Sequence, residues 1–190
     1  MKEGLIKDTY ELIIKEIQTV ITVCYLLAVA IGMIFNYKKY AEFGINIFDY
    51  GDVFDFLIAP FSDFYIILFA AASTLFISTL FYLDYLWQKK WPKSYSKMNF
   101  GRDKKKWFKQ YRMAVIAVSF ITYLFLSASF YGKYTKEKIT NQRDITITLV
   151  DNEIKKGKLI GKTKEIVFLL NDDGVFAIPL TSVVKQIKLK

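Results

Sequence analysis

Residues 88–112 read QKKWPKSYSKMNFGRDKKKWFKQYR, and this basic stretch decides how the rest of the chain is arranged. It contains one acid, Asp103, and ten basic residues. The basic residues are Lys89, Lys90, Lys93, Lys97, Arg102, Lys104, Lys105, Lys106, Lys109 and Arg112. Uncharged runs flank the stretch on both sides, and loops rich in Lys and Arg between membrane spans stay in the cytoplasm. We therefore expect 88–112 to be a cytoplasmic loop.

Three uncharged runs, 17–37, 64–83 and 113–132, explain a composition that is 53% hydrophobic and 17% aromatic. Each has about the 20 residues that a helix needs to cross the hydrocarbon layer. The sequence thus predicts a multi-pass cell-membrane protein with an α-helical bundle of three spans. Residues 1–16 form an amphipathic segment before the first span, and they are expected either to lie on the membrane surface or to continue the span as helix.

The distribution of positive charge predicts the orientation. Three lysines before the first span and the ten basic loop residues make thirteen on one side, against six on the other. Lys and Arg near span ends favour the cytoplasm. We expect the N-terminus and 88–112 to be cytoplasmic and the C-terminal domain to be extracytoplasmic.

Residues 44–60 are too apolar for an ordinary loop and predict an interfacial or re-entrant helix that Pro60 ends. Three carboxylates recur there at every third residue, which would put them on one stripe of a helix, and a further one follows at the start of the second span. In an oligomer these acids could form an acidic vestibule that attracts cations, or they could be the solvated face of the helix. The four are Asp49, Asp52, Asp55 and Asp63.

The second span concentrates small and hydroxylated residues in one part of its length. Such residues allow close helix packing in lipid, where the hydrophobic effect no longer drives association. We expect this face to mediate a homo-oligomer, or alternatively to pack on another span of the same chain. Its members are Ala70, Ala71, Ala72, Ser73, Thr74 and Ser78. Near the end of this span, Asp84 is expected to pair with Lys89 or Lys90.

Residues 140–190 change from helical periodicity to alternation, which is typical of strands. Strands are expected at 144–150, 154–160, 165–170, 175–178 and 184–189, with a short turn at 179–183 and with Val167, Leu169 and Ile178 pointing inward. This plan, over GKLIGKTKEIVFLLNDDGVFAIPLTSVVKQI, resembles the small β-barrels of the SH3 and Sm type. The resemblance implies a small all-β barrel and no catalytic residues. The alternating apolar positions of 140–190 are enough for one small core, so we expect this barrel to fold by itself.

The chain offers little for catalysis. It has no histidine, and its single cysteine, Cys24, lies in the first span. The segment GKLIGKT at 157–163 has one residue too few between its glycines for a phosphate-binding loop, and it leads into a strand. We expect no enzyme activity, no catalytic residues, no cofactor and no metal site. The net charge of +9 is concentrated in one loop, so membrane lipids are the expected partner and nucleic acid is not.

Three functional hypotheses follow. The first is a non-catalytic, homo-oligomeric sensor or effector that couples a β-barrel binding module to a membrane bundle. The plan resembles that of membrane components of prokaryotic antiphage systems, such as the membrane subunit of Kiwa, which implies a role in antiviral defence. The second is an ion channel, or a channel accessory subunit, with an acidic outer vestibule. The third is a membrane anchor whose basic loop docks a cytoplasmic protein partner.

Overall fold

The computed structural model describes residues 2–188, with side chains over 16–181 and 183–188. Three segments in it are long and apolar enough to cross a membrane: Glu16–Ala41 within α1 (Lys2–Ala41), α3 (Phe64–Lys90) and α5 (Phe108–Thr140). The backbone of α1 is one continuous helix, so the N-terminal segment continues the first span as the alternative interpretation predicts. The amphipathic face predicted for 1–16 concerns side chains that, apart from Glu16, lie outside the described residues.

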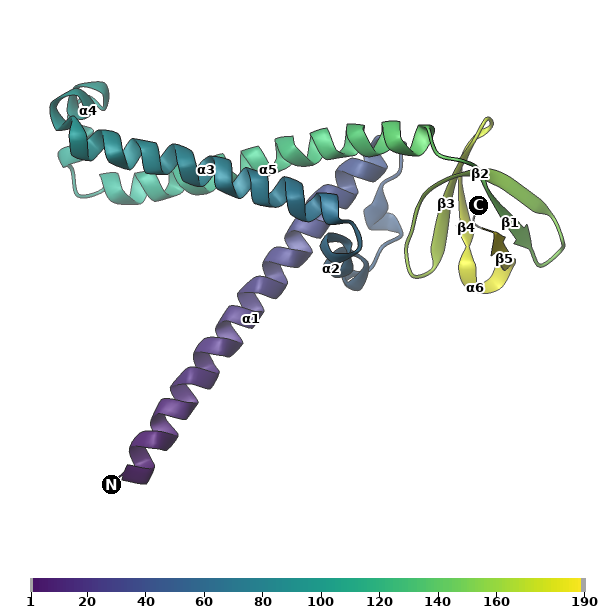
Figure 1. The fold of residues 1–190 in the computed structure, drawn as a ribbon, viewed down its shortest axis with the longest axis horizontal. Helices are drawn as coiled ribbons and strands as arrows, with labels where there is room; N and C mark the ends of the chain where they lie inside the picture. Colours follow the sequence, from purple (N-terminus) through teal and green to yellow (C-terminus); the bar gives the residue numbers. More distant parts are fainter. Residues whose placement is uncertain (1, 189–190) are drawn as a thin grey trace.

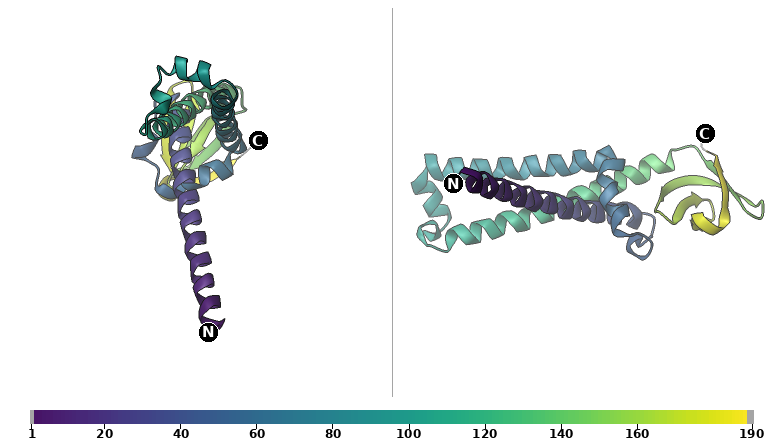
Figure 2. Two further views of the ribbon diagram at one scale, coloured as in Figure 1. Left: turned by 90° about the vertical axis from the view of Figure 1, so that its left-hand side faces the viewer. Right: turned by 90° about the horizontal axis from the view of Figure 1, so that it is seen from below.

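The helices α3 and α5 lie side by side as a long hairpin, with α4 (Pro92–Met98) at one end and the sheet at the other (Figure 1). At the connection, η2 (Arg102–Lys104) lies between α4 and α5. The C-terminal end of α1 packs near the sheet, and toward its N-terminus α1 diverges from the hairpin (Figures 1 and 2). Exposed apolar side chains cover most of these helices, which fits a lipid environment.

The connection between α1 and α3 contains η1 (Ile47–Asp49) and α2 (Val53–Ser62). The predicted helical stripe of three carboxylates is wrong, because the helix begins only at Val53 and Asp52 is its N-cap. The Asp52 carboxylate accepts hydrogen bonds from the backbone of Phe54 and Asp55, which fixes the start of the helix there.

Pro60 does not end α2, which continues to Ser62. A proline inside a helix cannot donate to the carbonyl four residues earlier, here that of Phe56. Gly32 of α1 packs against this carbonyl, and a Cβ at Gly32 would overlap its oxygen. Gly32 therefore allows α1 and α2 of one chain to approach closely.

The C-terminal strands form one antiparallel sheet of order β4-β3-β2-β1-β5. The strands are β1 (Ile145–Leu149), β2 (Ile154–Lys162), β3 (Ile166–Asn171), β4 (Gly174–Pro179) and β5 (Val184–Lys188). The first half of β2 pairs with β1 and its second half pairs with β3. A register shift between Leu159 and Gly161 bends the strand between these two partners.

The prediction of a closed barrel is wrong. The edge strands β4 and β5 each pair on one side only, and the short helix α6 (Leu180–Val183) connects them instead of a hydrogen-bonded ladder. The backbone N–H of Leu180 donates to Glu165, and that of Val150 donates to Val183. Leu180 and Val183 pack against the core of the sheet, so α6 covers the opening that barrel closure would have filled.

The two faces of the sheet belong to different cores. Val167, Leu169 and Ile178 point inward to the concave core, as the alternation predicts. On the opposite face, Ile160 and Phe168 are buried against the ends of the membrane helices. Burial on both faces explains why β3 reads as the unbroken apolar run IVFLL.

Candidate functional site

The sheet is docked on the helix ends through a shared hydrophobic core, which we call the junction. Its buried members come from α1, the loop after it, α2, α5, β2 and β3. They are Tyr40, Ile45, Ile47, Phe56, Ile139, Ile160 and Phe168. The ring of Tyr40 meets the ring of Phe168 edge-on, with 5.3 Å between the centroids. The absence of a side chain at Gly161 makes room for Tyr40, whose hydroxyl a Cβ there would overlap.

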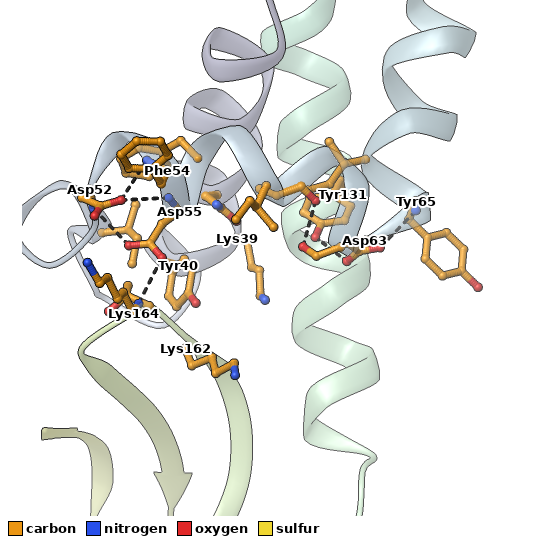
Figure 3. A pocket seen from close by; sticks show the side chains of 18 of the residues that line it. Lys39, Tyr40, Asp52, Phe54, Asp55, Asp63, Tyr65, Tyr131, Lys162 and Lys164 are labelled. Carbon is orange, nitrogen blue, oxygen red and sulfur yellow. Dashed lines mark hydrogen bonds between the residues drawn. The ribbon is translucent and has the colours of Figure 1, made fainter. Parts of the chain in front are cut away.

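A cleft of about 750 Å³ lies beside the junction, between α1, α2, α3, α5 and the connection from β2 to β3 (Figure 3). This volume is in the range of small-molecule sites. Its walls combine charged side chains of both signs with exposed apolar ones. The charged residues are Lys39, Lys138, Lys162, Lys164, Asp52, Asp55 and Asp63.

The carboxylates of Asp52 and Asp55 are occupied by backbone hydrogen bonds. Each side chain accepts from the other residue's N–H at 3.0 Å, which makes a capping box at the start of α2. The second oxygen of Asp55 accepts from the backbone N–H of Lys164 at 3.0 Å. This bond joins α2 directly to the loop between β2 and β3, so Asp55 is part of the docking of the sheet.

Asp63 links the corner between α2 and α3 to α5. One carboxylate oxygen accepts from the Tyr65 N–H at 3.0 Å and so caps α3. The other accepts from the Tyr131 hydroxyl at 2.7 Å. Asp49, outside the cleft lining, accepts from the Asn46 amide at 2.9 Å. All four residues of the predicted vestibule thus accept hydrogen bonds from other groups of the chain, and their role at the mouth of an oligomer stays a prediction.

The four lysines of the cleft have no oppositely charged side chain in direct contact among the described residues, since none of them has a carboxylate oxygen within 4.0 Å. The Lys138 ammonium lies 4.9 Å from the centre of the Tyr65 ring, and that of Lys39 lies 5.1 Å from the Tyr40 ring. Lys39 is half-buried and is within electrostatic reach of Asp63 and Lys138. The cleft therefore contains positive charge that the protein does not neutralise by direct contact.

The predicted helix-packing face is divided in the structure. Ser73 is buried, and its hydroxyl donates to the Phe69 carbonyl of its own helix at 2.7 Å. Ser127 of α5 donates to the same carbonyl at 3.3 Å. This part of the face packs within the chain. Ala71, Ala72, Thr74 and Ser78 are exposed and Ala70 is half-buried, so association between chains stays a prediction.

The basic loop is folded. Tyr95 of α4 is buried against Trp87 and Phe108, and burial together with the charge of Asp84 raises the pKa of its phenol. The expected partners of Asp84 are wrong: its carboxylate pairs with Arg112 at 2.7 Å, because α3 and α5 are antiparallel and bring these residues together. Nine of the ten basic side chains are exposed.

Sequence reasoning found the acids of the cleft and missed its lysines. Lys39 and Lys138 belong to helices, and Lys162 and Lys164 belong to the connection expected between the strands at 154–160 and 165–170. Only the fold brings them together. The one available signal was GKLIGKT, whose last two residues, Lys162 and Thr163, line the cleft. No group of three or more metal-ligating side chains occurs among the described residues. Comparisons of the chain with protein-family models, curated proteins and solved structures found no match.

Proposed function

We propose that this chain is a non-catalytic multi-pass membrane protein that binds a ligand in the cleft and transmits the binding event to its membrane helices. One observation carries the proposal: the sheet and the ends of α1, α2 and α5 share one core and border one cleft. A ligand that contacts both walls stabilises one arrangement of sheet and helices over others. Differential contact of this kind is what a conformational sensor requires.

The proposed orientation places the cleft on the extracytoplasmic side and the basic loop in the cytoplasm. The thirteen-to-six distribution of Lys and Arg supports it. In this arrangement α1 and α5 connect the ligand site to the opposite side of the membrane. A homo-oligomer and a role in antiviral defence remain proposals that rest on the exposed small-residue face of α3 and on the general plan of the chain.

A second candidate is a membrane anchor that docks a cytoplasmic protein. The folded loop between α3 and α5 favours it, because a loop with a buried centre at Tyr95 presents its nine exposed positive charges on a defined surface. The channel hypothesis has weaker support, since hydrogen bonds from the protein already occupy the carboxylates of the cleft. Single-channel recording of the reconstituted protein would reveal conduction.

The coupling can be tested with the single cysteine. Cys24 is exposed on α1 and lies 16 residues before Tyr40, roughly 24 Å along the helix. A nitroxide attached there in the reconstituted protein reports the motion of α1. Gly161→Val forces the sheet away from Tyr40, so we expect the label to become more mobile.

Ala114→Val is the control, because Ala114 is exposed near the start of α5, at the end of that helix far from the junction, and the change adds apolar bulk there. Its spectrum should equal that of the unchanged protein. An identical spectrum for Gly161→Val would show that the sheet does not influence α1, and the sensor proposal would fail.

A further inference from the structure

Two lysines from different parts of the fold converge in the cleft. Lys39 is in the last turn of α1, and Lys162 ends β2. The Lys39 ammonium lies against the backbone of β2, 3.1 Å from where a Cβ of Gly161 would be. Figure 3 shows the side chains of Lys39 and Lys162 extending into the same space, with the Tyr40 hydroxyl beside them. This arrangement puts two ammonium groups and one hydroxyl around a common position.

The protein leaves this charge without a direct partner. Asp55 and Asp63 accept hydrogen bonds on both carboxylate oxygens from Lys164, Tyr65, Tyr131 and the α2 cap. Neither carboxylate comes within 4.0 Å of a lysine ammonium in the described part of the chain. Bringing two cations together in a partly buried cleft costs free energy, and a bound anion with several acceptor oxygens would offset that cost. The geometry therefore fits a phosphate group.

The apolar wall of the cleft could contact an apolar part of such a ligand. Phe54, Ile58 and Phe64 line the cleft and are 65%, 57% and 70% exposed. These residues belong to α2 and to the first turn of α3, at the end of a helix long enough to span a membrane. Lipid headgroups lie at this depth, with acyl chains next to the apolar side chains. A water-soluble anion would make no use of three exposed hydrophobic groups.

We propose that the cleft binds the phosphate headgroup of an anionic membrane lipid, with Lys39 and Lys162 on the phosphate and the acyl chains along Phe54, Ile58 and Phe64. Lys138 and Lys164, at the sides of the cleft, add to the positive field. This inference deepens the proposed function and rests on it, since the lipid would be the ligand that joins sheet and helices. It also gives a use to Lys162 of the segment GKLIGKT.

The test is calorimetric titration of the full-length protein in a nonionic detergent with short-chain phosphatidic acid. Short-chain phosphatidylcholine, with no net charge, and glycerol 3-phosphate, with no acyl chains, are titrated in parallel. We expect phosphatidic acid to bind at least about tenfold more tightly than either, which corresponds to about 1.4 kcal/mol. Equal affinity for phosphatidylcholine would overturn the anionic specificity, and equal affinity for glycerol 3-phosphate would overturn the lipid assignment.

The variant Lys39→Gln with Lys162→Gln should lose about tenfold or more in affinity for phosphatidic acid, because two charge-assisted hydrogen bonds are removed. Lys156→Gln with Lys188→Gln removes the same charge from the far side of the sheet, where both residues pair with Thr146 of β1. This control should bind as the unchanged protein does. An equal loss in both variants would contradict a local site.

Lys39→Arg with Lys162→Arg keeps both charges and should retain binding within a few-fold, which decides the matter if the glutamine variant does not fold. The inference and the proposed function can fail separately. The Cys24 label responds to Gly161→Val without added lipid, so coupling between sheet and α1 can hold while lipid binding is absent. A tight lipid complex with no change at Cys24 would keep the site and remove the sensor.

Discussion

At the scale of single residues, Gly32 gives the sharpest prediction. Gly→Ala inside a helix usually stabilises it by about 1 kcal/mol. Here the added Cβ would overlap the Phe56 carbonyl oxygen, which is backbone and cannot turn aside. We expect Gly32→Ala to lower the free energy of unfolding by about 1–3 kcal/mol, as overpacking does.

Thermal unfolding of the detergent-solubilised protein, followed by circular dichroism, measures this effect. Ala30→Val is the control, because Ala30 is exposed on the same helix. A higher Tm for Gly32→Ala would mean that α1 and α2 are farther apart than described.

The hydrogen bond from Tyr131 to Asp63 is a second residue-scale test. Tyr131→Phe keeps the ring against Phe35 and removes the donor to a carboxylate that is only partly solvated. Hydrogen bonds to charged groups contribute about 1.5–3 kcal/mol to stability, so we expect Tyr131→Phe to lower the free energy of unfolding by an amount of this order. The control is Tyr123→Phe, because the Tyr123 ring stacks on Phe76 at 4.6 Å. This change should alter the free energy of unfolding by less than about 0.5 kcal/mol. Similar effects for both variants would argue against this bond.

At the scale of elements, Arg112 closes the far end of the α3–α5 hairpin. Its guanidinium contacts Asp84 at 2.7 Å and Gln88 at 2.9 Å. Arg112→Gln should destabilise the hairpin by about 1 kcal/mol at low salt and by less at high salt, because the pair is partly exposed. Lys109→Gln removes an exposed charge from the same turn and is the control. Unfolding midpoints in low and high salt decide the question, and no difference between the variants would contradict the role of the pair.

The order of the elements could be predicted from the sequence because each depends on a local pattern. The uncharged runs indicate the membrane helices, and alternation with turn residues such as Asp172 and Asp173 indicates the strands. Pro60 misled the prediction of a helix end, because α2 continues past the proline to Ser62 although one helix hydrogen bond is lost there. Barrel closure could not be predicted, since it depends on whether β4 and β5 pair, which no local pattern reports.

The site was harder to predict than the fold. Acids spaced every third residue suggested one helical face, but an N-cap at Asp52 divides them between a loop and a helix. The lysines of the cleft are far apart in the chain, so their convergence follows from the docking of the sheet. That docking depends on the outward face of β3, where Phe168 could be recognised as apolar without any indication of what covers it.

At the scale of the whole molecule, orientation is the first test. A reporter active only in the cytoplasm should give signal when inserted within 93–97 and none when fused after Lys190, because the ten basic residues of the loop favour the cytoplasm. Immunoblotting is the control that both fusions are expressed at equal levels. The reverse pattern of activity would invert the proposed topology.

The docking of the sheet on the membrane helices also changes what is expected of a fragment. The sequence alone suggested that 140–190 folds by itself. In the structure, Ile160 and Phe168 are each 1% exposed only because the junction covers them. A fragment without α1, α2 and α5 would expose this face, so it should be less stable than the sheet in the full chain and prone to associate.

The central claim, that the sheet and the helix ends form one unit, is tested most directly by hydrogen exchange in the full chain. Tyr40→Ala removes a helix side chain that contacts Phe168, and its effect is read at the amides of β2 and β3. Loss of a buried aromatic ring costs about 3–5 kcal/mol. We expect amide exchange across 158–170 to accelerate by at least about tenfold. A tenfold acceleration requires the free energy of opening to fall by only about 1.4 kcal/mol. Tyr25→Ala, at an exposed position of α1, should leave it unchanged. Equal protection of β2 and β3 with and without the Tyr40 ring would contradict the account.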